Sequence, residues 1–160
     1  MCVLRATGRS FEPRAFLAGS KLTPFMVYRL GDPEHRGRTH STSGFRVDVS
    51  RRDGSDLDGQ IEDAIAFLET HRVDLERLAT ADGIEDIRLD FPVDLRIEEG
   101  KVCAQFEYFP PALLSKAGEL GLGLEVSLYP HEPGQLTTPA NQELQRTTGL
   151  PRFARSPVRR

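Results

Sequence analysis

The sequence contains only two cysteines in 160 residues and no apolar run long enough to cross a membrane. Cys2 and Cys103 are far apart, which matches neither a zinc-type spacing nor a disulfide framework. A membrane-spanning helix needs about 18 or more consecutive apolar residues. The first residues also lack the apolar segment and cleavage site of a secretory signal. We therefore expect a cytoplasmic chain without a membrane segment, a disulfide or a metal site.

Sequence motifs of the common catalytic classes are missing as well. No serine lies in a G-x-S-x-G motif, and neither cysteine has the surroundings of a nucleophile. His35 and His40 are five residues apart in a loop, and His71 and His131 are isolated, so no histidine pair has the spacing of a zinc site. The sequence favours a protein without enzymatic activity and predicts no catalytic residue and no cofactor.

The chain has no excess of basic residues. Charged residues make up 28% of the sequence and the net charge is −3, which argues against general nucleic-acid binding. The charge is uneven, because residues 135–160 contain five Arg against one Glu, a balance of +4 that leaves −7 for the rest of the chain. Such a basic segment is either a solvated tail or a region that binds an acidic surface.

The apolar pattern predicts one domain over residues 1–130, followed by a Pro-, Thr- and Arg-rich tail over 131–160 with one helical turn near 142–146. In the first helix, Ser10 is a candidate N-cap and Pro13 lies in the first turn. The strands and helices predicted in the domain are, in order, strand 2–7, helix 10–18, strands 24–30 and 45–50, helix 56–82, strands 87–97 and 102–110, helix 110–120 and strand 122–130.

The central helix has the clearest pattern. Asp56 or Ser55 would cap it, Gly83 would end it, and a bend is expected near Thr70. Apolar residues recur at steps of three and four, which places them on one helix face that also contains a histidine, interpreted as a core residue. The members of this stripe are Leu57, Ile61, Ala64, Leu68, His71, Leu75 and Leu78.

The two strands that follow read as a β-hairpin joined at "EEGK", residues 98–101. Pro92 cannot donate a ladder hydrogen bond, so its strand should be an edge strand or contain a bulge. The resulting order β-α-β-β-α-β-β-α-β predicts an α+β fold with a mixed, mostly antiparallel sheet and helices packed on one face. Its first elements follow the ferredoxin-like order.

The loop Gly31–Gly44 is the one candidate ligand-binding segment. Its arginines suit a phosphate or carboxylate, its hydroxyl groups can donate hydrogen bonds, and its glycines allow close approach of the backbone. A solvated connection between two strands would have a similar composition. The candidate residues for an anionic small molecule are Arg36, Arg38, His35, His40, Ser41, Thr42 and Ser43.

Three stretches together resemble the bacterial domain-of-unknown-function family catalogued under number 4279. They are "FEPRAFLAGSKLTPFMVYRLGDPEHRGRTHSTSGFRVDVS", "DLDGQIEDAIAFLE" and "PPALLSKAGELGLGLEVSLYP". The resemblance covers about residues 2–130, with Phe45 where the family has Trp. It implies a small cytoplasmic bacterial α+β domain and transfers no catalytic residue.

Two functions agree with these observations. The first is a non-catalytic binding or protein-interaction module that forms a homodimer or binds a protein partner through a sheet edge or a helix face. The alternative is a small-molecule binding protein or enzyme that recognises an anionic ligand through the Gly31–Gly44 loop.

Overall fold

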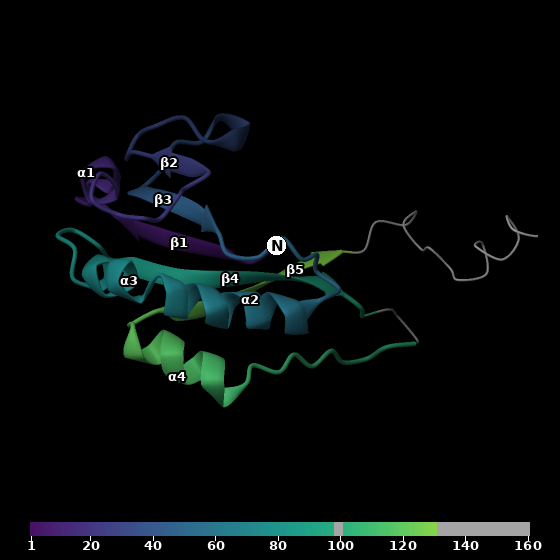
Figure 1. Ribbon diagram of the computed structural model, residues 1–160. Helices are drawn as coiled ribbons and strands as arrows, with labels where there is room; N and C mark the ends of the chain where they lie inside the picture. Colours follow the sequence, from purple (N-terminus) through teal and green to yellow (C-terminus); the bar gives the residue numbers. More distant parts are fainter. Residues whose placement is uncertain (98–100, 131–160) are drawn as a thin grey trace, which may run out of the picture. The chain divides into compact units, whose positions relative to one another are not determined.

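The structure is a computed structural model that describes residues 1–97 and 101–130, except for the side chain of Arg36 (Figure 1). Residues 131–160 lie outside the described residues, so the predicted boundary at residue 130 and the tail with its helical turn stay predictions. The elements are β1 (Val3–Gly8), α1 (Pro13–Leu17), β2 (Met26–Tyr28), the 3-10 turn η1 (His35–Gly37), β3 (Ser43–Asp48), α2 (Leu57–Thr70), α3 (Arg72–Ala79), β4 (Asp86–Leu95), α4 (Pro111–Glu119) and β5 (Gly123–Pro130).

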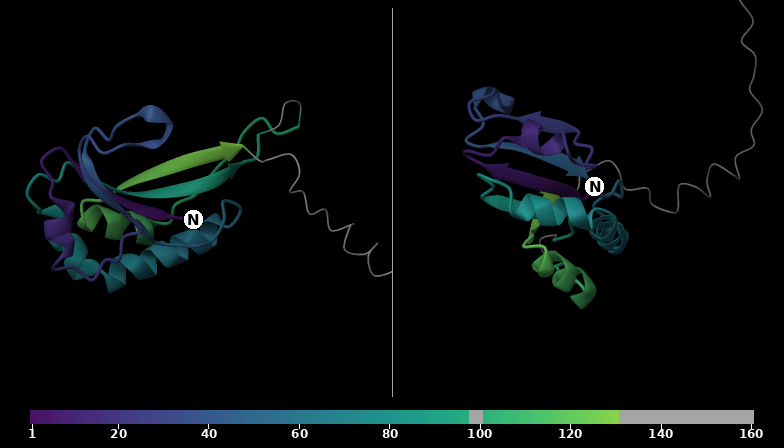
Figure 2. Two further views of the ribbon diagram at one scale, coloured as in Figure 1. Left: turned by 90° about the horizontal axis from the view of Figure 1, so that it is seen from above. Right: turned by 60° about the vertical axis from the view of Figure 1, so that its left-hand side comes forward.

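The strands form one mixed sheet in the order β2-β3-β1-β4-β5. The pairs β2–β3, β3–β1 and β1–β4 are antiparallel, and β4–β5 is parallel. Helices α2, α3 and α4 lie on one side of this sheet, and the loop between β2 and β3 lies toward the other side (Figure 2). The predicted α+β class with a mixed, mostly antiparallel sheet is therefore confirmed.

The apolar stripe of the central segment forms two helices that meet at His71. Asp56 caps α2, because its Oδ1 accepts a hydrogen bond from the Gly59 amide at 3.0 Å. The stripe residues other than His71 are buried. His71 itself is half-buried at the junction, with its ring 4.5 Å from that of Phe67. The predicted bend is thus a break between helices, and the interpretation of His71 as a core histidine was wrong.

The first helix also differs from the prediction at its start. It begins at Pro13, as the proline pattern indicated, but its N-cap position is Glu12 and no side chain caps it. Ser10 lies two residues earlier and is exposed, so it has no capping role. The helix is a single short turn whose Pro13 is buried.

The predicted hairpin is wrong, because residues 103–110 form no strand. The neighbour of β4 is instead β5, which runs parallel to it after the α4 crossover. The pairing of β4 with β1 ends at Asp90. Beyond Asp90, two side chains and the Gly54 carbonyl form hydrogen bonds with the β4 backbone on the edge that β1 leaves open. Gln105 bonds to the Asp94 carbonyl and the Arg96 amide, and Gln60 donates to the Pro92 carbonyl at 3.0 Å. Pro92 thus lies beyond the end of β1, so the backbone N–H that proline lacks is not needed for pairing with that strand.

The core lies between the sheet and the helices. Its largest fully buried side chains include Phe11, Phe45 and Phe91. Phe45 stacks on Phe16 with ring centroids 6.0 Å apart, and Phe91 meets Phe109 edge-on at 5.2 Å. Alternation along each strand places the next residues, many of them polar, on the opposite face. No helix of the described residues covers this second face, which we call the uncovered face, and it contains the candidate functional site.

We expect a thiol reagent to modify only one of the two cysteines quickly in the native protein. Cys2 is fully buried, and burial raises the pKa of its thiol to about 12, so the reactive thiolate is almost absent at mildly alkaline pH. Cys103 is exposed. Following the colour of Ellman's reagent should show one fast thiol, and a second only in denaturant. The Cys103→Ser variant should lose the fast phase, and a fast phase that persists in it would contradict the burial of Cys2.

Candidate functional site

The uncovered face of the sheet contains two adjoining hollows that share the side chains of Arg5 and Arg46. One has a volume of about 250 Å³ and a mainly polar lining: Thr7, Tyr28, Glu34, His40, Ser41, Thr42, Asp86 and Arg88. The other has a volume of about 480 Å³ and a mostly apolar lining: Met1, Val3, Phe25, Asp90, Pro92 and Tyr129. Together they form a groove with one polar and one apolar end.

Three arginines lie side by side across the floor of this groove. In the register of the sheet, Arg5 on β1 is directly opposite Arg46 on β3 and directly opposite Arg88 on β4. Directly opposite residues on a sheet face have Cβ atoms about 5 Å apart, and like charges at that separation destabilise the pairing. We call Arg46, Arg5 and Arg88 the arginine row. Its repulsion has to be offset by anions, either in the protein or in a ligand.

Two members of the arginine row have carboxylate partners. Arg5 forms an ion pair with Asp90 at 2.5 Å, and the other Asp90 oxygen accepts a hydrogen bond from Ser127 at 2.6 Å. Arg88 pairs with Asp86 at 2.6 Å, and this hydrogen bond, with the negative charges of Asp86 and Glu125, raises the pKa of Arg88 against the opposing effect of burial. Glu125 lies within 3.5 Å of both arginines. The protein itself neutralises this part of the row.

Arg46 is the exception. Among the described residues, no carboxylate lies within ion-pair distance of its guanidinium, although Asp48 is two residues along the same strand face. Its Nε is buried and has no hydrogen-bond partner in the structure. Arg46 nevertheless lines both hollows, so its guanidinium is within reach of a ligand in the groove. A half-buried arginine without a counterion is a strong recognition element for a carboxylate or phosphate.

Tyr28 and His40 border the polar hollow beside Arg46. Their rings stack with centroids 3.9 Å apart. Burial raises the pKa of the Tyr28 hydroxyl, and the Arg46 guanidinium acts in the opposite direction. Tyr28 fits against β3 because Gly44 has no side chain: a Cβ there would come within 2.8 Å of the Tyr28 hydroxyl. Gly44 thus accommodates a neighbouring side chain of the groove.

The structure brings only some of the predicted loop residues to this groove. His40, Ser41 and Thr42 line the polar hollow. His35 and Arg38 are exposed and line neither hollow. The remaining two predicted residues contribute no described contact to it.

The two residues are Ser43 and Arg36. Ser43 is buried, and its hydroxyl accepts a hydrogen bond from the Leu30 amide at 3.1 Å, which holds the ends of the loop together. The side chain of Arg36 lies outside the described residues.

The arginine row and Tyr28 were not predicted from the sequence. Arg46 and Arg88 lie on the polar side of alternating strands, but alternation does not show which strands are neighbours. Three strands with a central arginine on their polar face could have suggested a row, if their order in the sheet had been known.

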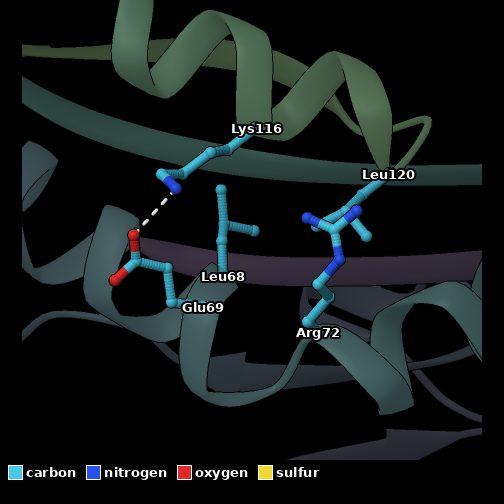
Figure 3. A pocket seen from close by; sticks show the side chains of 5 residues that line it. All are labelled: Leu68, Glu69, Arg72, Lys116 and Leu120. Atoms are coloured by element: carbon cyan, nitrogen blue, oxygen red, sulfur yellow. Dashed lines mark ion pairs between the residues drawn. The ribbon is translucent and has the colours of Figure 1, made fainter.

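A smaller hollow of about 140 Å³ lies between α2 and α4 (Figure 3). Leu68 and Leu120 form its apolar lining, and Lys116 pairs with Glu69 across it at 2.7 Å. Arg72 pairs with Glu119 of α4 at 3.2 Å. Both cations of this hollow are already neutralised, so it lacks the unpaired charge that distinguishes Arg46.

Two kinds of feature are absent from the described residues, 1–97 and 101–130. No group of three or more His, Cys, Asp or Glu side chains is placed to hold a metal ion. No helix in this part of the chain has the length and apolar character needed to span a membrane.

Comparison with known proteins identifies the family. No curated protein and no solved structure matches the chain. A family model matches residues 1–131, which include the whole sheet, the helices and the arginine row. This confirms the resemblance seen in the sequence: the chain belongs to the family described as Domain of unknown function (DUF4279).

Proposed function

We propose that this protein is a binding module for a small organic acid held on the uncovered face of the sheet. The observation that supports this proposal is that Arg46, at one end of the arginine row, has no carboxylate partner within residues 1–97 and 101–130. A ligand carboxylate would supply the missing acceptor through charge-assisted hydrogen bonds to the guanidinium. It would also offset the repulsion between Arg46 and its neighbour Arg5. Binding then stabilises the sheet that forms the site.

The apolar end of the groove determines what else the ligand contains. Met1, Val3, Phe25 and Tyr129 line the hollow of about 480 Å³ next to Arg46. A hollow of this size lies within the range of small-molecule sites. An alkyl or aryl group attached to the acid would be removed from water there. We therefore infer an amphipathic acid, with its carboxylate at Arg46 and its apolar part toward Tyr129.

The polar end of the groove would orient the ligand. His40, Ser41 and Thr42 lie at the end of the loop that leads into β3, and the Thr7 hydroxyl lies across the same hollow. These groups suit a second polar substituent on the ligand. In this proposal the loop contributes through the residues next to β3, and the exposed Arg38 has no part in binding.

Isothermal titration calorimetry with acetate, butanoate and hexanoate at constant ionic strength tests the proposal. The affinity should rise along the series, because each buried CH₂ contributes about 0.8 kcal/mol, or about fourfold in affinity. Arg46→Gln removes the charged donors while keeping a polar side chain. We expect it to weaken hexanoate binding by about 10- to 100-fold, the range for a hydrogen bond to a charged group.

Arg38→Gln is the matched control, because it removes the same charge from an exposed position outside the groove. It should leave hexanoate binding unchanged. Equal weakening in both variants would mean that only net charge matters, and the proposal would be abandoned. The same holds if hexanoate binds the unaltered protein no better than acetate or inorganic phosphate does.

A further inference from the structure

A second feature of the sheet does not depend on the arginine row: in the part of the chain that the structure describes, the outer edge of β5 is unpaired. β5 is the last strand of the sheet, and Figure 2 shows it beside β4 with no further strand next to it. Among residues 1–97 and 101–130, no backbone group outside β4 pairs along it. The opposite edge strand, β2, has only three residues, whereas β5 has eight. A long unpaired edge is a template for pairing with another chain.

The side chains of β5 add an apolar surface to this edge. Leu124, Val126 and Leu128 are in register with buried residues of β4, so they point to the helix side of the sheet. Leu124 packs against the core, but Val126 is 40% exposed and Leu128 is 53% exposed. The second half of β5 therefore presents both unpaired backbone groups and uncovered apolar side chains.

Features that protect edge strands from association are missing between Gly123 and Tyr129, and the proline of β5 is its last residue, Pro130. Natural sheets protect their edges with lysine, proline, bulges or charged residues. Between Gly123 and Tyr129 the only charged residue is Glu125, and its carboxylate already faces Arg5 and Arg88. Neither lysine nor proline occurs in this stretch.

We propose that the outer edge of β5 pairs with β5 of a second copy of this chain, antiparallel about a two-fold axis at Val126. In this register each Leu124 lies opposite the partner's Leu128, and the two Val126 side chains face each other. Glu125 lies opposite the partner's Ser127, so no like charges are directly opposite across the interface. The strand is thus complementary to itself in both apolarity and charge, which is what an isologous interface requires.

Such a pair would form one continuous sheet. A two-fold axis perpendicular to the sheet keeps the helices of both copies on the same side. The two uncovered faces, each with its arginine row, then lie on the other side. The edge that is open in one chain becomes an interior strand pair, and the apolar groups of Val126 and Leu128 are covered.

Sedimentation velocity of the full chain over a wide concentration range tests the pairing. We expect the unaltered protein to have twice the monomer mass. Leu128→Lys and Val126→Lys each place a charge against an apolar partner and should raise the dimer dissociation constant at least tenfold. Val73→Lys is the control, because Val73 is 78% exposed on α3 and lies outside β5. It should sediment as the unaltered protein does, and circular dichroism should show all variants folded.

Oxidative cross-linking tests the register. In a Cys103→Ser background, Val126→Cys should yield a disulfide-linked dimer, and Val73→Cys should remain monomeric on a non-reducing gel. A protein that stays monomeric at all concentrations overturns the proposal. So does a dimer that survives both lysine substitutions. Neither result bears on Arg46, because the acid-binding proposal concerns a groove within one chain.

Discussion

Gly83→Ala is expected to lower the free energy of unfolding by about 3–5 kcal/mol, which is close to the whole stability of a marginal domain. Two separate effects add at this position. Gly83 has a φ of +75°, a left-handed conformation that an L-residue adopts only at a cost. A Cβ there would also lie 2.5 Å from the carbonyl carbon of Ser10 and 2.7 Å from the Phe11 nitrogen. Both atoms are backbone, so no flexible side chain can move aside.

The close approach at Gly83 lies where β1 ends and where the chain enters β4. A Cβ on Gly8, the last residue of β1, would collide with the Gly83 carbonyl oxygen. Immediately beyond, the Glu85 amide donates to the Thr7 carbonyl at 2.9 Å, next to the pairing of β1 with β4. A displacement of this loop therefore disturbs the strand pair that holds Arg5 opposite Arg88.

Gly121→Ala separates the two effects. Gly121 has a similar φ of +69°, but nothing lies within 4 Å of the position of its Cβ. We expect this substitution to lower the free energy of unfolding by only about 1–2 kcal/mol, the cost of the left-handed conformation alone. Urea denaturation followed by far-ultraviolet circular dichroism measures both variants. Similar losses for Gly83→Ala and Gly121→Ala would show that the backbone contact at Gly83 has no energetic weight.

Phe45→Ala is expected to lower the free energy of unfolding by about 3–5 kcal/mol, the range for removing a large aromatic side chain from a core. Phe45 is fully buried on the helix side of β3. Its ring stacks on that of Phe16 and lies 6.1 Å from that of Phe11. Truncation would leave a cavity between α1 and the sheet that these two rings cannot fill without moving.

Phe106→Ala is the matched control for this core substitution. It removes the same atoms, but Phe106 is 87% exposed. Its effect on the free energy of unfolding should stay within about 0.5 kcal/mol. Urea denaturation of both variants at one temperature makes the comparison. A loss below about 1 kcal/mol for Phe45→Ala would mean that the aromatic cluster does not anchor β3.

The position of Phe45 also connects stability with the site. It precedes Arg46 in β3, so alternation directs its ring to the core and the arginine to the groove. The conservative variant Phe45→Leu keeps an apolar side chain in the core and should remain folded. In that variant, hexanoate binding should change far less than in Arg46→Gln. The two residues are neighbours in sequence but contribute to different properties.

The sequence by itself determined the local structure of this protein. The apolar pattern predicted a strand over residues 45–50, and Phe45 and Val47 are buried in it. The period of the central segment predicted a helix with a bend, and Asp56 is its cap. These features could be predicted because propensity, capping and periodic burial depend on residues within a few positions of one another.

Only the tertiary structure decided which strands are neighbours, because pairing between distant segments depends on the packing of the whole sheet. Residues 102–110 alternate like a returning strand, yet β5 takes the place beside β4 and Gln105 bonds to the free end of β4. The arginine row has the same origin. Arg5, Arg46 and Arg88 are more than 40 residues apart in sequence, and only the order β3-β1-β4 places them side by side. The site is therefore a property of the strand order, which no local pattern in the sequence records.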